Sequence, residues 1–97
     1  MIFCNNMDST SAGGPSFESA EFDATGPWQY NIYGPFGGAS VTLLGSTKAN
    51  EWNAVPEAST IKSGQWTIQS DAGAKYKIAI TGLTDASSIT ATSGTGN

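Results

Sequence analysis

Apolar and polar residues alternate with a period of two in several short runs along this chain. The clearest run is "PWQYNIYG", in which Trp28, Tyr30 and Ile32 alternate with Gln29, Asn31 and a further tyrosine. Such alternation is typical of a strand that buries one of its faces. The pattern predicts about seven strands, in the runs "SFESAEFDATG", "PWQYNIYG", "ASVTLLG", "NEWNAV", "GQWTIQS", "KYKIAITG" and "SSITATS".

Turn-forming residues separate these runs. The segment "GPFGG" combines the fixed φ of Pro35 with glycines that adopt conformations other residues resist, so it predicts a hairpin corner. The segment "DAGA", residues 71–74, predicts a second hairpin that pairs "GQWTIQS" with "KYKIAITG". No window has a helical period over a competing length. The sequence therefore predicts an all-β fold, an antiparallel β-sandwich of immunoglobulin-like or jelly-roll strand order.

The start of the chain lacks this alternation and runs into two glycines and a proline. This pattern predicts an extended N-terminal arm over residues 1–15, followed by the sandwich domain over residues 16–97. The arm is either a flexible terminus or a segment that becomes ordered on a neighbouring subunit. The second alternative follows from Ile2, Phe3 and Met7, which would otherwise be exposed to water, and it makes these three candidate partner-binding residues.

Composition and charge narrow the classes of partner. Ser, Thr, Gly and Ala make up nearly half of the chain, so the few aromatic residues are expected to dominate the core. The net charge is −4, with four Lys and no Arg, which gives neither a phosphate-binding stripe nor a cationic membrane face. No run is long and apolar enough to span a bilayer, and the start does not resemble a secretory leader. We therefore expect no nucleic-acid or membrane partner, and a chain that stays where it is made.

Reactive residues are few. The chain has no His and a single Cys4, so it lacks an imidazole base, histidine zinc ligands and a thiolate cluster. Paired carboxylates of the glycosidase type remain formally possible, but a sandwich of this size has little volume for a cleft. Asp23, Asp71 and Asp85 each begin a loop and could meet around calcium, although turn chemistry explains them more simply. The sequence predicts no enzyme activity, cofactor or metal site.

Exposed aromatic rings offer a different chemistry. A tyrosine or tryptophan ring presents a flat apolar face to a pyranose, while nearby amides supply hydrogen bonds. The candidates for such a platform are Tyr33, on the face opposite Trp28, and Trp52, beside two asparagines and a glutamate. The alternative for both rings is packing in the core.

Four segments of the chain follow one plan: "GPWQYNIYGPFGGASVTLLGS", "EWNAV", "SGQWTIQS" and "AKYKIAITGLTDASSITAT". The plan is a strand, a glycine-rich corner, a Val-Thr-Leu strand, a tryptophan strand, and a final pair built on a tyrosine and alternating isoleucines. In this plan residues 26–92 resemble the small β-sandwich virion proteins of tailed bacteriophages, of the head decoration or cement type. The chain departs from that pattern at "TKAN", which stands in place of an Asp-Gly-rich turn, and in its first 20 residues.

The resemblance implies a non-enzymatic structural protein of the virion, which is assembled in the host cytoplasm. Such a protein would bind the major capsid protein lattice on its outer surface, in many copies or as a homo-oligomer, and stabilise the head. Its partners would be the major capsid protein or other virion subunits. Two alternatives stay open: a component of the tail, neck or fibre base, and a carbohydrate-binding adhesion module.

Overall fold

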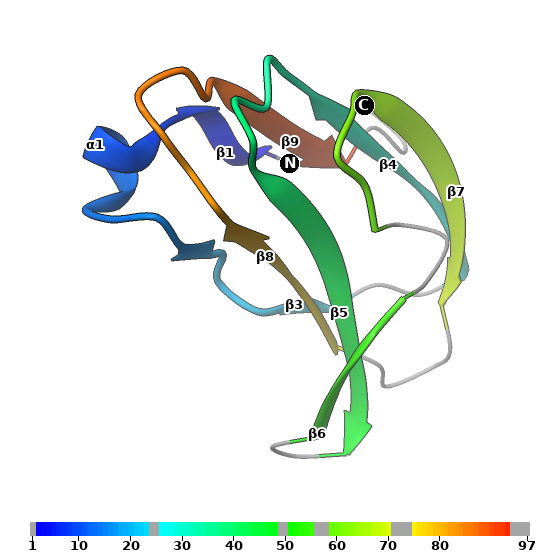
Figure 1. The fold of residues 1–97 in the computed structure, drawn as a ribbon. Helices are drawn as coiled ribbons and strands as arrows, with labels where there is room; N and C mark the ends of the chain where they lie inside the picture. The colour runs from blue at the N-terminus through cyan, green and yellow to red at the C-terminus, as the bar shows by residue number, and fades with distance from the viewer. Residues whose placement is uncertain (1, 24–25, 49–50, 56–58, 71–74, 94–97) are drawn as a thin grey trace.

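The strands form two antiparallel sheets that pack together, as the computed structural model in Figure 1 shows. The structure describes residues 2–23, 26–48, 51–55, 59–70 and 75–93. The prediction of an all-β sandwich is confirmed. The elements in chain order are β1 (Ile2–Met7), α1 (Ser9–Ala12), β2 (Phe17–Glu18), β3 (Phe22–Asp23), β4 (Gly26–Tyr33), β5 (Ser40–Lys48), β6 (Glu51–Ala54), β7 (Gly64–Ser70), β8 (Lys75–Thr81) and β9 (Ile89–Ser93).

The strand order is that of a jelly roll. One sheet, here called sheet A, has the order β1-β9-β4-β7, and the other, sheet B, has the order β2-β8-β5-β6, with β3 also paired to β8. The two halves of the chain pair in nested fashion: β5 with β6, β4 with β7, β2 and β3 with β8, and β1 with β9. Successive pairs alternate between the sheets, as when one long antiparallel hairpin is rolled up. Of the two strand orders left open by the sequence, the jelly roll is the one observed.

Two predicted hairpins are wrong because consecutive strands of the roll join different sheets. The segment "GPFGG" lies between β4 of sheet A and β5 of sheet B. Likewise β7 belongs to sheet A and β8 to sheet B, so these strands are not paired; residues 71–74 themselves lie outside the described residues. β7 instead pairs with β4, in unbroken register from Gly26 opposite Ser70 to Ile32 opposite Gly64. Turn residues mark where a strand ends, but not which sheet the next strand joins.

The alternation predicted for β4 is confirmed. Trp28, Tyr30 and Ile32 are buried between the sheets, whereas Gln29 and Tyr33 are exposed. The other strands add their own inward side chains to this core, namely Cys4, Val41, Leu43, Ile68, Tyr76, Ile78, Ile80, Ile89 and Ala91.

Aromatic rings connect the two sheets through the core. Trp28 of sheet A lies edge-on to Tyr76 of sheet B, with ring centroids 5.6 Å apart. Phe22 of β3 meets the same Trp28 ring at 5.5 Å and 90°. Each such pair contributes about 0.5–1.5 kcal/mol beyond the apolar area that it buries. Aromatic rings therefore bridge the two sheets, but aliphatic side chains outnumber them among the described core residues, so the expectation that aromatic residues would dominate the core is met only in part.

β1 contradicts the arm predicted over residues 1–15. The strand pairs antiparallel with β9 at the edge of sheet A, and the one-turn helix α1 follows it. Phe3 stacks on Phe22 with ring centroids 4.7 Å apart, so it belongs to the core of the same molecule. Register shifts on both sides of Cys4 break the alternation of β1, which explains why the sequence pattern does not reveal a strand. The described part of the sandwich thus begins at β1 and not at residue 16.

Cys4 gives a direct test of this strand. Its side chain is 6% exposed, its thiol donates to the Ile89 carbonyl oxygen at 3.5 Å, and burial raises the pKa of the thiol. We expect a maleimide to label Cys4 at least about 100-fold more slowly in the folded protein than in urea, because the thiol becomes accessible only when β1 opens. The measurement is the labelling rate by mass spectrometry. Equal rates in the two conditions would mean that residues 2–7 are a free arm.

The "GPFGG" segment is clasped by the segment that joins β8 to β9. Ser87 Oγ donates to the Phe36 carbonyl oxygen at 2.7 Å, and the Ser88 N–H donates to the Pro35 carbonyl oxygen at 2.8 Å. Gly37 makes this close approach possible: its φ is +60°, and a Cβ atom there would lie 2.6 Å from the Ser87 nitrogen. The two crossings between the sheets therefore support each other.

A pair of glycine substitutions tests the clasp. Gly38 has a φ of +94° but open space where a Cβ would lie, so Gly38→Ala introduces backbone strain alone. Gly37→Ala introduces similar strain and also forces the two segments apart. We expect Gly38→Ala to lower the free energy of unfolding by about 1 kcal/mol and Gly37→Ala by about 2–4 kcal/mol, measured by urea denaturation. Equal losses for the two variants would contradict the clasp.

Candidate functional site

The outer face of sheet A carries a row of uncharged polar side chains. Asn31 of β4 is in the middle of the row, opposite Thr92 of β9 on one side and Gln65 of β7 on the other. Tyr33, two residues further along β4, lies opposite Thr90. We call this surface the amide face and define it by six residues: Asn5, Asn31, Tyr33, Gln65, Thr90 and Thr92.

Hydrogen bonds hold the centre of the amide face. Asn31 Nδ2 donates to Thr92 Oγ1 at 3.4 Å, and Gln65 Nε2 donates to the Tyr33 hydroxyl at 3.2 Å. The Tyr33 side chain is nevertheless 46% exposed. Asn31 is buried, and its Oδ1 atom has no hydrogen-bond partner among the described residues. A buried carbonyl oxygen without a donor is uncommon in folded proteins, so this oxygen is an unsatisfied acceptor at the centre of the face.

The row continues to the edge of the sheet at β1. Thr90 Oγ1 donates to Asn5 Oδ1 at 3.2 Å and accepts from the Asn6 N–H at 3.1 Å. Asn6 Oδ1 in turn accepts from Ser88 Oγ at 3.3 Å. Asn6 has a φ of +51°, a left-handed conformation that asparagine tolerates better than most residues. The bulged strand β1 therefore extends the polar surface of β9 outward.

The amide face suits neutral polar ligands. None of its six residues is Asp, Glu, Lys or Arg, so it offers amide and hydroxyl groups beside one exposed ring. Such groups can bind a polyhydroxyl compound or an uncharged protein surface by hydrogen bonds and ring contact. They provide neither a nucleophile with an adjacent base nor a set of carboxylate ligands.

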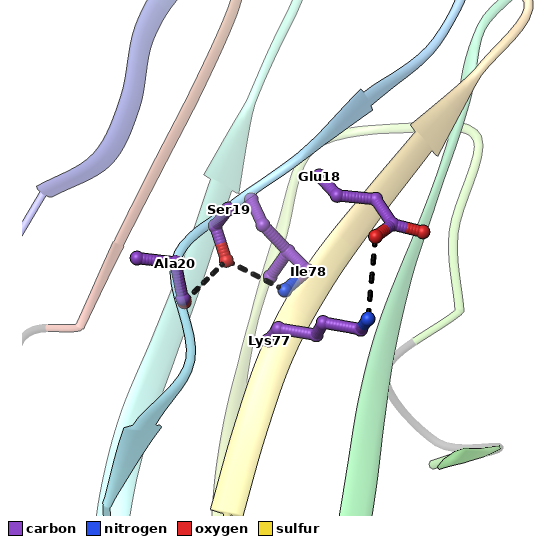
Figure 2. Close-up of polar contacts among 5 residues, drawn as sticks. All are labelled: Glu18, Ser19, Ala20, Lys77 and Ile78. Carbon is purple, nitrogen blue, oxygen red and sulfur yellow. Dashed lines mark hydrogen bonds and ion pairs between the residues drawn. The ribbon is translucent and has the colours of Figure 1, made fainter. Parts of the chain in front are cut away.

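The outer face of sheet B has a different character. Lys77 of β8 is central to it and forms an ion pair with Glu18, which Figure 2 shows. Lys77 Nζ lies 3.2 Å from Glu18 Oε1 and 4.5 Å from the centroid of the Trp52 ring. Lys75 of the same strand pairs with Asp23 at 2.9 Å, and this pairing raises the pKa of Lys75. Sheet B thus presents ion pairs and a cation–π contact where sheet A presents amides.

The structure separates the two rings of the predicted aromatic platform. Tyr33 lies on the outer face of sheet A, whereas Trp52 is half-buried in β6 of sheet B beneath Lys77. The two rings therefore cannot bind one ligand together. Tyr33 retains an exposed ring with amide neighbours, and Trp52 already has a cation over its face.

The three predicted partner-binding residues also differ in their accessibility. Ile2 is 67% exposed at the edge of sheet A. Phe3 and Met7 are half-buried and pack against the core, so their side chains are largely occupied within the molecule. Ile2 is the member of this set whose side chain is open to a partner.

A second exposed isoleucine lies elsewhere. Ile61 is 74% exposed and borders a shallow hollow of about 350 Å³ beside the bridge between Val41 and Thr60. The hollow is otherwise lined by Ser40, Thr42 and Ser59, which bear hydroxyl groups. Among the described residues, its lining therefore presents no ionisable group to a ligand.

The aspartates considered as calcium ligands are dispersed. Asp23 pairs with Lys75, Asp85 accepts a hydrogen bond from Ser9 Oγ at 3.1 Å, and Asp71 lies outside the described residues. Within the described part of the chain, no three His, Cys, Asp or Glu side chains gather as metal ligands would. No helix there is long and apolar enough to cross a membrane.

Most of the amide face was not singled out by the sequence analysis. Alternation along β4 placed Asn31 and Tyr33 on the outward side, but it gave no sign of which residues lie beside them. Gln65 is 32 positions away from Tyr33 in the chain, and Thr90 is 85 positions away from Asn5. A usable signal was the regular spacing of Gln and Thr between apolar positions of β7 and β9.

The comparisons with known proteins give no relative from which a role could be transferred. No protein-family model, no curated protein and no solved structure matches the chain.

Proposed function

We propose that this chain is a non-enzymatic structural protein of a virion, a decoration protein that binds the outer surface of the major capsid protein lattice and stabilises the head. It binds in many copies, and it stabilises the head by contacts with the capsid subunits.

The observation that carries the proposal is the jelly-roll strand order. Jelly-roll domains recur in viral capsids and in lectins, the two settings that the sequence had already suggested. One fold serves many functions, so the strand order supports this role by analogy of fold. The surfaces of the molecule supply the physical support.

Those surfaces suit repeated weak contacts. The main cost of burying a polar interface is the removal of charges from water. The amide face is uncharged, so it can be buried against a protein without this cost. Each copy needs only a modest contact, about 800 Å² per partner, because a symmetric lattice multiplies the contacts. The net charge of −4 gives no affinity for packaged nucleic acid.

The test is binding of the purified protein to virus particles that lack it. We expect binding to saturate at roughly hundreds of copies per particle, a number comparable to that of the major capsid subunits. The bound copies are counted by quantitative mass spectrometry after the particles have been sedimented. We also expect Ile2→Ser to weaken retention about tenfold or more, because this exposed side chain would be buried at the contact.

Ile61→Ser is the matched control, since it makes the same change at a comparably exposed isoleucine. Retention of this variant should equal that of the parent protein. Saturation at about a dozen copies would favour the tail, neck or fibre base. No binding to particles would overturn the proposal.

A second candidate function, carbohydrate binding, is favoured by one specific feature of the amide face. The exposed ring of Tyr33 lies beside Gln65 Nε2, and the Asn31 side chain lies in the same row. A flat ring flanked by amides is the arrangement that binds a neutral sugar. The ligand class would be an uncharged glycan, because the six residues of the face are uncharged.

A glycan array separates this candidate from the first. If the face binds sugar, Tyr33→Ala should abolish binding, whereas Trp52→Ala should leave it unchanged because that ring lies on the other sheet. Thermal unfolding of both variants checks that the fold is kept. An array on which the parent protein binds nothing, or equal losses in the two variants, would remove the carbohydrate candidate.

A further inference from the structure

The four edges of the two sheets differ in how well they resist pairing with another chain. Sheet A ends in β1 and β7, and sheet B ends in β6 and in the β2 and β3 segments. An unprotected edge presents a row of backbone N–H and C=O groups that can template a further strand. Charges, bulges, interruptions and short length are the usual protections.

Three of these edges carry such protections. β1 is broken by register shifts and contains Asn6 with its left-handed φ. β6 has four residues, and its pairing with β5 shifts register between the Gly45–Asn53 pair and the Lys48–Glu51 pair. The β2–β3 edge is interrupted at Ser19, whose hydroxyl accepts from the Ile78 N–H at 2.9 Å in place of a continuing strand; Figure 2 shows this bond. Glu18 and Asp23 add acidic groups to the same edge.

β7 lacks these protections. Its seven residues, "GQWTIQS", contain no charged residue and no proline. Every one of them pairs with β4 in a single unbroken register. Among the described residues no strand pairs with its other side. Figure 1 shows β7 at the margin of sheet A.

We propose that β7 is a self-association edge, at which the β7 strands of two copies pair antiparallel about a two-fold axis at Thr67. The two copies of sheet A then form one continuous sheet. In this register Thr67 lies opposite Thr67 of the second copy, Trp66 lies opposite Ile68, and Gly64 lies opposite position 70. A two-fold contact uses the same patch on both partners, so the patch must be complementary to itself.

The sequence of β7 meets that requirement. Because the strand has no charge, pairing it with itself opposes no like charges. Trp66 and Ile68 both face the core side of the sheet, and Trp66 is half-buried although its ring lies 5.8 Å from Tyr30. Each copy would place its Ile68 position beside the Trp66 of the other. Aromatic and β-branched residues in opposite positions stabilise an antiparallel pair by about 0.2–1 kcal/mol, and the symmetry supplies two such pairs.

On the outer side the same contact enlarges the amide face. Gln65 and Thr67 point outward from β7, and both are exposed in the single chain. Pairing brings the amide faces of two copies side by side on one sheet. The inference does not depend on the proposed virion role, because it concerns the isolated protein.

The test uses charges at the centre of the contact. The Thr67 side chain is exposed, so Thr67→Lys and Thr67→Glu should each keep the fold, checked by circular dichroism and thermal unfolding. In the proposed dimer each variant opposes two like charges at the axis. We expect the parent protein to dimerise with increasing concentration between about 10 µM and 1 mM in sedimentation velocity, and each variant to dimerise at least about tenfold more weakly.

Mixing the two variants supplies the sharpest measurement. An equimolar mixture should recover dimers at the level of the parent protein, because Lys then lies opposite Glu. Asn53→Lys on the exposed edge β6 is the control, with the same change in charge and no expected effect. A parent protein that stays monomeric, a dimer that Asn53→Lys disrupts, or a mixture that does not recover would each overturn the proposal.

Discussion

The nested pairing of the two halves of the chain is the constraint on which the other features depend. Each strand pair presents its inward side chains to the next pair, which lies in the opposite sheet, so one register error would displace side chains from the core. Trp28 of β4 and Tyr76 of β8 meet between the two sheets because β4 pairs with β7, and β8 with β5, without a register shift. β1 closes the roll by pairing with β9 and adds Phe3 to the same group of rings.

Tyr30 shows how strongly this core favours large rings. The side chain is fully buried, and burial raises the pKa of its hydroxyl. In the part of the chain that the structure describes, that hydroxyl has no hydrogen-bond partner. Leaving a hydroxyl unpaired costs about 1–3 kcal/mol. Burying the ring removes roughly 150–250 Å² from water, which stabilises by about 4–6 kcal/mol at 25 cal/mol per Å². In a chain with few large apolar residues, the free energy gained by burying the Tyr30 ring exceeds the cost of leaving its hydroxyl unpaired.

The sequence predicted local features well and long-range pairing poorly. The alternation of Trp28, Tyr30 and Ile32 follows from the geometry of a single strand, and it is confirmed. The predicted hairpins are wrong because a turn does not determine which sheet receives the next strand. β1 was missed because its register shifts remove the period-two signal. The amide face shares this limitation: Tyr33 was predicted to face outward, but its neighbour Gln65 is placed there by the pairing of β4 with β7.

The difference between the two outer faces indicates how copies of this protein would be oriented in an assembly. Burying the sheet B surface would remove the exposed charges of Glu18, Lys75 and Asp23 from water at a large desolvation cost. Burying the sheet A surface involves amides and hydroxyls, whose hydrogen bonds a partner can replace. The unbroken edge β7 belongs to the same sheet as the amide face. In the proposed assembly, contacts with other copies and with the lattice would therefore both form on sheet A, and sheet B, with its ion pairs, would face the solvent.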